Sequence, residues 1–298
     1  MKYTFYPGCS LEASAKPYDM STRAVCRALG VELVEIDDWN CCGATAYMSV
    51  RELKSFAISA RNLALAEPLG NDILTACPAC YLVLNKAHHY CEDDPRLKAK
   101  LTAALGAAGL AFKNTSRVRH ILDVFHNDLG EALVRSKVTR PLKGLKVAPY
   151  YGCQVSRPLA EFDDAEFPVS MDNVLRWAGA EVVDFPLKAK CCGGMMMSTE
   201  EKVSLELVKR LLDLAYDRGA DCIAVACPMC QVNVDAYQDR VSKLNGRTYA
   251  MPTLFFTQLL GAAFGLPESE LGLRMGIVPT DAILAKVGKG SEVTKDAG

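Results

Sequence analysis

Residues 72–80 read DILTACPAC and residues 221–230 read DCIAVACPMC, and these two stretches carry most of the information about the fold. In each, a short run of mainly apolar residues leads directly into a Cys-Pro dipeptide. Such a run predicts a buried strand, and proline suits the first turn of a helix, where its missing N–H is not needed. Both stretches therefore predict a strand that turns into a helix, with two cysteines at the turn.

The cysteines upstream of each stretch follow one pattern, which the chain contains twice. A single cysteine, a Cys-Cys-Gly and a Cys-Pro-x-Cys follow in the same order. They are separated by 31 and 34 residues in the first copy (10 to 40, 43 to 76) and by 37 and 34 in the second (154 to 190, 193 to 226). Ten of the thirteen cysteines belong to this pattern: Cys9, Cys41, Cys42, Cys77 and Cys80, then Cys153, Cys191, Cys192, Cys227 and Cys230.

Alternating strand and helix patterns surround both copies. We expect an α/β protein with two homologous α/β domains from an internal duplication, residues 1–143 and 144–298. Each domain should contain a small, mainly parallel sheet flanked by helices, with the cysteines at strand ends near the domain interface, because ligands of open α/β sheets bind there. The predicted strands are 3–7, 31–36, 72–76, 145–151, 181–185 and 221–226, and the predicted helices are 17–29, 49–67, 94–109, 169–178 and 198–218.

Composition narrows the class of protein. The chain has 298 residues, is 50% hydrophobic and 23% charged, and has a net charge of −1. These values fit globular domains and give no general attraction to nucleic acid or anionic membranes. We find no signal-peptide layout and no apolar stretch of the roughly 18–20 residues that span a bilayer. We therefore expect a cytoplasmic protein without direct membrane insertion, in which clustered cysteines hold metal or carry out redox chemistry.

Five thiols per repeat exceed what ordinary metal sites use. Structural zinc sites and common iron–sulfur clusters take four protein ligands. Either the fifth cysteine is a free redox thiol, or the cofactor needs five. Adjacent cysteines need a tight turn to reach one cofactor, and Gly43 and Gly193, directly after each pair, allow it. Structural zinc and reduced core thiols remain the alternatives.

This double pattern resembles the catalytic, B-type subunit of heterodisulfide reductase, a member of the cysteine-rich CCG domain family. The resemblance covers nearly the whole chain and includes all ten pattern cysteines. It implies two noncubane [4Fe–4S] clusters, one per domain, each held by five cysteines. It also implies reductive cleavage, or reverse formation, of a disulfide such as that of coenzyme M and coenzyme B, lying between the two clusters.

The resemblance also implies partners. Heterodisulfide reductases use a ferredoxin-like, C-type iron–sulfur subunit together with a flavin-containing A-type subunit, and the chain itself has no G-x-G-x-x-G nucleotide fingerprint. The alternative interpretation is a CCG-type electron-transfer subunit that acts on another sulfur species, a quinone or a partner enzyme.

Several residues outside the cysteine pattern have two interpretations. Lys188, Lys190 and Arg157 offer positive charge near the second cysteine set, for an anionic substrate or for a reduced cluster, or they belong to a solvated loop. Gly43 and Gly193 are further candidates for lining the substrate site. The four histidines are expected in helical stretches, as surface or packed residues, with a proton donor among them left open. Met195-Met196-Met197 either line an apolar slot or pack in the core, and the charged 288–298 end is a candidate partner contact.

Overall fold

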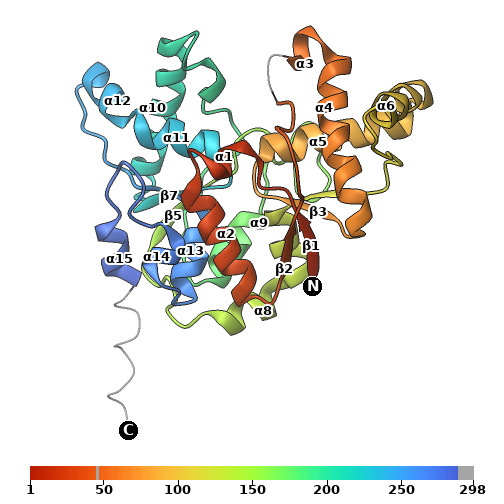
Figure 1. The fold of residues 1–298 in the computed structure, drawn as a ribbon. Coiled ribbons are helices and arrows are strands. Elements are labelled where there is room, and N and C mark those ends of the chain that lie inside the picture. Colours follow the sequence, from red (N-terminus) through yellow and green to blue (C-terminus); the bar gives the residue numbers. More distant parts are fainter. Residues whose placement is uncertain (45–46, 288–298) are drawn as a thin grey trace.

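Two four-stranded parallel sheets form the framework of the protein in the computed structural model, which describes residues 1–44 and 47–287. The strand orders are β2-β1-β3-β4 and β6-β5-β7-β8, so the second sheet repeats the topology of the first (Figure 1). The predicted α/β class and duplication are confirmed. The strands are β1 (Lys2–Phe5), β2 (Glu32–Glu35), β3 (Ile73–Thr75), β4 (Val118–His120), β5 (Lys146–Tyr150), β6 (Glu181–Val182), β7 (Cys222–Val225) and β8 (Thr253–Phe255).

Helices flank both sheets. The first half contains α1 (Gly8–Glu12), α2 (Lys16–Ala28), α3 (Tyr47–Val50), α4 (Glu52–Ala66), η1 (Glu67–Leu69), α5 (Pro78–Asp93), α6 (Pro95–Ala107), α7 (Ile121–Asp123), η2 (Val124–Leu129) and α8 (Gly130–Lys137). The second half contains α9 (Ser170–Trp177), η3 (Gly194–Met196), α10 (Glu201–Asp217), α11 (Pro228–Ala236), α12 (Gln238–Asn245), α13 (Phe256–Ala263), α14 (Glu268–Leu271) and α15 (Asp281–Val287). Among the described residues, no helix combines the length and apolar character needed to cross a bilayer.

The strand order places a crevice at one edge of each sheet. β1 has β2 on one side and β3 on the other, so the chain crosses over in opposite directions from its central strand. A crevice forms at the carboxyl ends of strands where the order reverses in this way. Cys9 follows β1 and Cys77 follows β3, so both lie at this point of the first sheet. Cys153 and Cys227 follow β5 and β7 in the same way.

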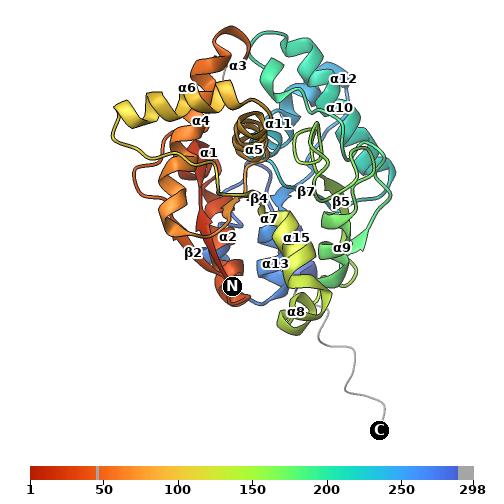
Figure 2. The same ribbon diagram turned by 90° about the vertical axis from the view of Figure 1, so that its right-hand side faces the viewer.

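The two halves exchange helix contacts. α2 of the first half packs against α13 of the second, while α9 of the second half packs against α7 and η2 of the first. Figure 1 shows α2, α9 and α13 in the region between the strands of the two halves, and Figure 2 shows α13 near the middle of the molecule. At this interface the Ser21 and Thr257 hydroxyls are 2.7 Å apart and buried, and the Tyr18 ring stacks on Phe255 at 4.1 Å between centroids. A single hydrophobic core therefore runs through both halves.

Some local predictions were wrong. The last strand of each sheet, β4 and β8, was not recognised, because a strand of three residues carries too little alternation to detect. His120 accordingly ends a strand and does not lie within a helix. The helices predicted over 49–67 and 198–218 correspond to α4 and α10, which begin later, at Glu52 and Glu201, with no side-chain cap bond. The predicted domain boundary at 143/144 falls between α8 and β5 and stays a prediction, and the 288–298 end lies outside the described residues.

The Tyr18 hydroxyl provides a test of the interface. It donates a 3.1 Å hydrogen bond to the buried carbonyl of Ala226, in the other half. Tyr18→Phe should lower the free energy of unfolding by about 1 kcal/mol, since it leaves that carbonyl without this donor. Tyr90→Phe, at an exposed position on α5, should change it by less than about 0.5 kcal/mol. Urea unfolding of both variants measures the difference, and equal effects would mean that the contact does not stabilise the interface.

Candidate functional site

The five thiols of the first repeat converge at the carboxyl ends of β1 and β3. Cys42 is hydrogen-bonded to both Cys41 and Cys80, and Cys80 is also hydrogen-bonded to Cys77. Cys9 lies close enough to Cys41 for a negative charge on one sulfur to disfavour a charge on the other. We call these five residues the first quintet.

The second quintet has the same organisation at the ends of β5 and β7. Cys192 Sγ and Cys230 Sγ are 3.5 Å apart. Cys191 is hydrogen-bonded to Cys153 and Cys192, and Cys230 to Cys227. All five thiols of each repeat are therefore linked by short contacts, although they come from three separate segments of the chain.

A glycine makes room for the buried thiol of each Cys-Pro-x-Cys. Gly8 has φ +72°, and a Cβ built on it would lie 2.9 Å from Cys80 Sγ. Gly152 has φ +76°, and its Cβ would lie 3.0 Å from Cys230 Sγ. Glycine is needed at both positions for two reasons. Other residues are strained in the left-handed backbone region, and a side chain would occupy the space of the thiol. The Gly-Cys dipeptide present in both copies was the sequence signal for this role, which sequence reasoning missed.

The Cys-Cys-Gly turns present backbone N–H groups to the sulfurs. Gly193 N donates to Cys191 Sγ at 3.3 Å and Gly194 N to Cys192 Sγ at 3.4 Å. Gly193 has φ +80° and Gly43 has φ +92°, as a tight turn requires. Ser204 Oγ donates to the Gly193 carbonyl at 2.9 Å, and Ser55 makes the equivalent bond to Gly43 at 3.2 Å. Helices α10 and α4 thus hold the two turns in place.

Thiol–thiol hydrogen bonds divide the negative charge unevenly within each quintet. Bonds from Cys41 and Cys80 lower the pKa of Cys42 to about 4, and bonds from Cys153 and Cys192 lower the pKa of Cys191 to about 2. The pKa of Cys80 is raised, because its proton is shared with Cys42 and Cys77 and because it is buried. Each site therefore concentrates thiolate character, the form that binds metal, on one of its two adjacent cysteines, while hydrogen-bonded neighbours such as Cys41 and Cys153 have a raised pKa.

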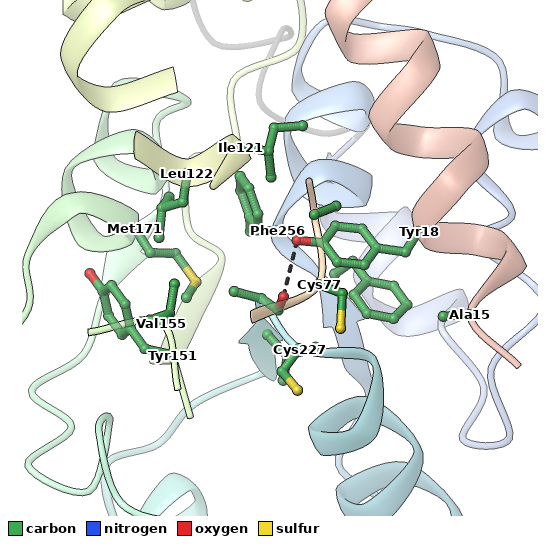
Figure 3. Packing of buried hydrophobic residues seen from close by; sticks show 14 of the residues in the cluster. Ala15, Tyr18, Cys77, Ile121, Leu122, Tyr151, Val155, Met171, Cys227 and Phe256 are labelled. Atoms are coloured by element: carbon green, nitrogen blue, oxygen red, sulfur yellow. Dashed lines mark hydrogen bonds between the residues drawn. The ribbon is translucent and has the colours of Figure 1, made fainter. Parts of the chain in front are cut away.

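Tyr18 lies beside both quintets. Burial raises the pKa of its hydroxyl, and the nearby sulfurs of Cys77 and Cys227 raise it further. Figure 3 shows these two cysteines next to the Tyr18 ring, with the ring's hydrogen bond to the other half drawn as a dashed line. Tyr18, at the interface between the repeats, therefore lies near one cysteine of each quintet.

Exposure differs among the members of a quintet. Cys9, Cys41 and Cys191 are exposed and Cys153 is half-buried, whereas the remaining six are buried. A pocket of about 600 Å³, lined by Trp39, Arg61 and others, reaches Cys41. Each site is thus open to a reactant on one side and enclosed by the fold on the other. The three cysteines outside the pattern, Cys26, Cys91 and Cys222, are buried, as expected of ordinary core thiols.

The predicted positive patch near the second quintet is paired with carboxylates. Lys188 is 9% exposed, and its Nζ donates to Asp172 Oδ1 at 2.7 Å and to the Pro168 carbonyl at 2.8 Å. The solvated-loop interpretation is therefore wrong for Lys188. Lys190, which is exposed, and Arg157 both pair with Glu166, at 3.1 and 2.8 Å.

His120 is held by two hydrogen bonds to the backbone, and His126 is held by a stacking contact. His120 Nε2 donates to the carbonyl of Ala76 at 3.0 Å, while Nδ1 accepts from Leu122 N at 3.2 Å. Burial lowers the pKa of His120 to about 4, so the ring is neutral near pH 7 and orients the backbone just before Cys77. His126 stacks on Trp177 of the second half.

The family description "Cysteine-rich domain" (CCG) matches residues 3–85 and 147–235, which is more than half of the chain and includes both quintets. The chain belongs to the CCG cysteine-rich family. This confirms the resemblance drawn from the cysteine pattern, and it supports an iron–sulfur, electron-transferring protein.

Curated relatives cover nearly the whole chain. It is 34% identical to the 8-methylmenaquinol:fumarate reductase membrane anchor subunit of Wolinella succinogenes, over 93% of this chain and 97% of the relative. It is also 34% identical to the B-type subunit of the ferredoxin/F420H2-dependent CoB-CoM heterodisulfide reductase of Methanosarcina acetivorans, over 96% and 97%. A solved structure of a hypothetical protein from Helicobacter pylori has a TM-score of 0.75 at 16% identity. This likeness, which concerns the fold alone, covers 93% of this chain and about half (52%) of that one.

The buried Lys188 ion pair yields a prediction with a control in the same loop. Lys188→Met removes the closer of the two cations of the buried Asp172 carboxylate, at 2.7 Å, and leaves only Arg176, at 3.8 Å. It should lower the free energy of unfolding by about 3 kcal/mol. Lys190→Met, at an exposed position, should lower it by less than about 0.5 kcal/mol. Chemical denaturation of the two variants measures the difference between their free energies of unfolding. A small effect at Lys188 would show that its charge is not needed for folding and is free for another role.

Proposed function

We propose that this chain is the catalytic iron–sulfur subunit of a heterodisulfide reductase-like complex, which cleaves or forms a disulfide. The observation that carries the proposal is the presence of two complete, converging thiol quintets, each with a cysteine near one interface residue, Tyr18. A reaction with one site needs one quintet, whereas a disulfide has two equivalent sulfurs to be received. The similarity to a B-type subunit of the heterodisulfide reductases supports the same interpretation.

The donor sets fit iron–sulfur clusters. Each contains only sulfur, with at least one cysteine whose pKa is lowered by its neighbours, and in the second quintet backbone N–H groups are directed at the sulfurs. Soft thiolate ligands of this kind suit iron–sulfur clusters or zinc. A fifth thiol exceeds the zinc requirement in both repeats. The resemblance to the heterodisulfide reductases implies a noncubane [4Fe–4S] cluster held by five cysteines, and we propose one such cluster for each quintet. The first quintet would hold one cluster and the second quintet the other.

The reaction balances as one disulfide, two electrons and two protons giving two thiols. The clusters, when bound, supply the electrons and iron positions that accept thiolate sulfur. The chain's part is to hold two acceptor positions at a fixed separation through the α2–α13 packing. Exposed Met195 and Met229, next to the second Cys-Cys-Gly, offer a polarisable apolar surface to the organic part of the substrate. Gly43 and Gly193, with Lys190 and Arg157, are proposed to line the approach.

Partners must deliver the electrons, since the sequence contains no G-x-G-x-x-G nucleotide-binding motif. Relatives named as subunits support a multi-subunit complex, and we propose that its other members are a ferredoxin-like protein and a flavin-containing protein. A second candidate function is electron transfer within a quinol-linked reductase. It is favoured by the equal identity, 34%, to the menaquinol:fumarate reductase subunit.

If the first quintet binds an iron–sulfur cluster, adding one methyl group at Gly8 should lower the iron content. Gly8→Ala would place a Cβ against Cys80 Sγ and should remove about half of the iron, because the first quintet loses its geometry. Gly30→Ala is the matched control: its φ of +73° gives the same backbone strain, of about 1–2 kcal/mol, and no atom lies within 4 Å of its Cβ. Iron analysis after anaerobic purification compares the two. Equal iron in both variants would contradict the assigned ligand geometry.

The function itself is tested with the reduced holoprotein and the disulfide of coenzyme M and coenzyme B. Two thiols should appear per disulfide consumed, and a new electron paramagnetic resonance signal should appear when either thiol is added. Cys9→Ser and Cys153→Ser should each abolish turnover, and Cys26→Ser should retain it. Oxidation by a menaquinone analogue, with no thiol release from the disulfide, would instead favour the second candidate.

A further inference from the structure

A group of metal-binding side chains lies on α5, away from the two quintets. His88, His89 and Glu92 place one ligand atom each within 4.8 Å of one another. His88 Nε2 is 3.5 Å from Glu92 Oε1, and His89 Nδ1 is 3.4 Å from Glu92 Oε2. Two ligands at the zinc bond lengths of about 2.0–2.1 Å and a tetrahedral angle would be about 3.3–3.4 Å apart.

The orientation of His88 is fixed by Asn114. Asn114 Nδ2 donates to the His88 carbonyl at 2.9 Å, so Oδ1 of the same amide is an acceptor. His88 Nδ1 lies 3.0 Å from that Oδ1 and must carry the proton. In the neutral ring, Nε2 is then left with its lone pair facing Glu92. Both residues are buried, at 8% and 7% exposure.

The orientation of His89 is fixed by Glu161, from the loop that follows Cys153. Glu161 Oε2 accepts a 2.9 Å hydrogen bond from the Tyr81 hydroxyl, and Oε1 pairs with His89 Nε2. The Nδ1 lone pair of the neutral ring therefore also faces Glu92. A second acceptor behind each imidazole is the usual support of a metal-binding histidine.

The Glu92 carboxylate needs a positive charge between it and the two rings, which either a proton on His89 or a metal ion can supply. Burial acts to lower the pKa of His89, but its hydrogen bonds to Glu161 and Glu92 raise it overall. The His88 nitrogen that faces Glu92 carries no proton in the neutral ring, and a metal ion would satisfy both imidazoles at once. We propose that His88, His89 and Glu92 bind one divalent transition-metal ion of the zinc type, with Asn114 and Glu161 as positioning residues. Two imidazoles and a carboxylate suit zinc, and water can complete the coordination from an adjoining pocket of about 390 Å³. Arg117 and Arg119 also line this pocket, but Arg119 is paired with Asp123 and Asp128.

The ion would connect the two repeats. Helix α5 begins at the Cys77-Pro78-Ala79-Cys80 turn of the first quintet, whereas Glu161 belongs to the segment between Cys153 and α9. Phe162, next to Glu161, already stacks on His120 with ring planes 6° apart. A metal behind His89 would fix this segment against the first repeat. The role is structural and does not depend on the proposed reaction.

Equilibrium dialysis of the cluster-loaded, chelator-washed holoprotein against radioactive zinc tests the site. The wild-type chain should bind one more zinc ion than the His89→Gln/Glu92→Gln variant. Glu161→Gln should weaken that ion about 10–100-fold, as expected for loss of an orienting carboxylate. Glu131→Gln is the matched control, since its carboxylate is as exposed as that of Glu92 (54% and 55%), and it should bind zinc like the wild type.

Zinc X-ray absorption provides a readout that is independent of stoichiometry. Nitrogen and oxygen neighbours at about 2.0–2.1 Å are expected, whereas sulfur neighbours at about 2.3 Å would place the ion at cysteines and overturn the proposal. Equal zinc binding by the wild type and the double variant would also overturn it. His88, His89 and Glu92 would then form an ion-pair network around a protonated His89. Because iron content is measured on the same samples, loss of the quintet clusters is seen separately.

Discussion

The close approach of a buried thiol to a glycine is the constraint on which both cysteine sites depend. Gly8 and Gly152 leave space for Cys80 and Cys230 at the point where the central strand of each sheet ends. The parallel sheet supplies the rest of the geometry, because it brings the ends of β1 and β3 to neighbouring positions. The thiols that follow these strands can then meet the Cys-Cys-Gly turn. Without the glycine, the innermost sulfur would have to move outward and the quintet would open.

The duplication produces two copies of the cysteine site and also an interface that both halves share. Helix α2 packs on α13 and α14 of the second half, and α9 packs on α7, η2 and α8 of the first, so helices of both halves meet at one interface. The core is shared, and the separation of the two quintets is fixed by side-chain packing in a dense interior, where small displacements are costly. A linker between independent domains could not maintain such a separation. Contacts between the helices of the two halves would therefore hold the quintets at one separation, as the proposed reaction of a two-ended reactant requires.

Much of this could be predicted from the sequence, and the limits have physical causes. Ten cysteines in a repeated order, with Pro78 and Pro228 at helix starts, identify the strand-to-helix turns correctly. The sequence did not reveal that Lys188 is buried, because its partner Asp172 is sixteen residues away on α9 and the pairing depends on tertiary packing. The three-residue strands β4 and β8 have too short a pattern to recognise. The role of Tyr18 between the quintets involves contacts across 208 residues, which local patterns do not contain.

The pairing of charges around the second quintet bears on how a substrate is chosen. Lys188 is committed to Asp172, and Glu166 neutralises part of the charge of Lys190 and Arg157. An anionic substrate would have to compete with Glu166 for exposed cations, and exposed ion pairs contribute only about 0–1 kcal/mol. Charge is therefore a weak basis for selection at this site. Under the proposed function, recognition would then depend more on the sulfur atoms of the reactant and on the exposed apolar surface of Met195 and Met229 than on its charge.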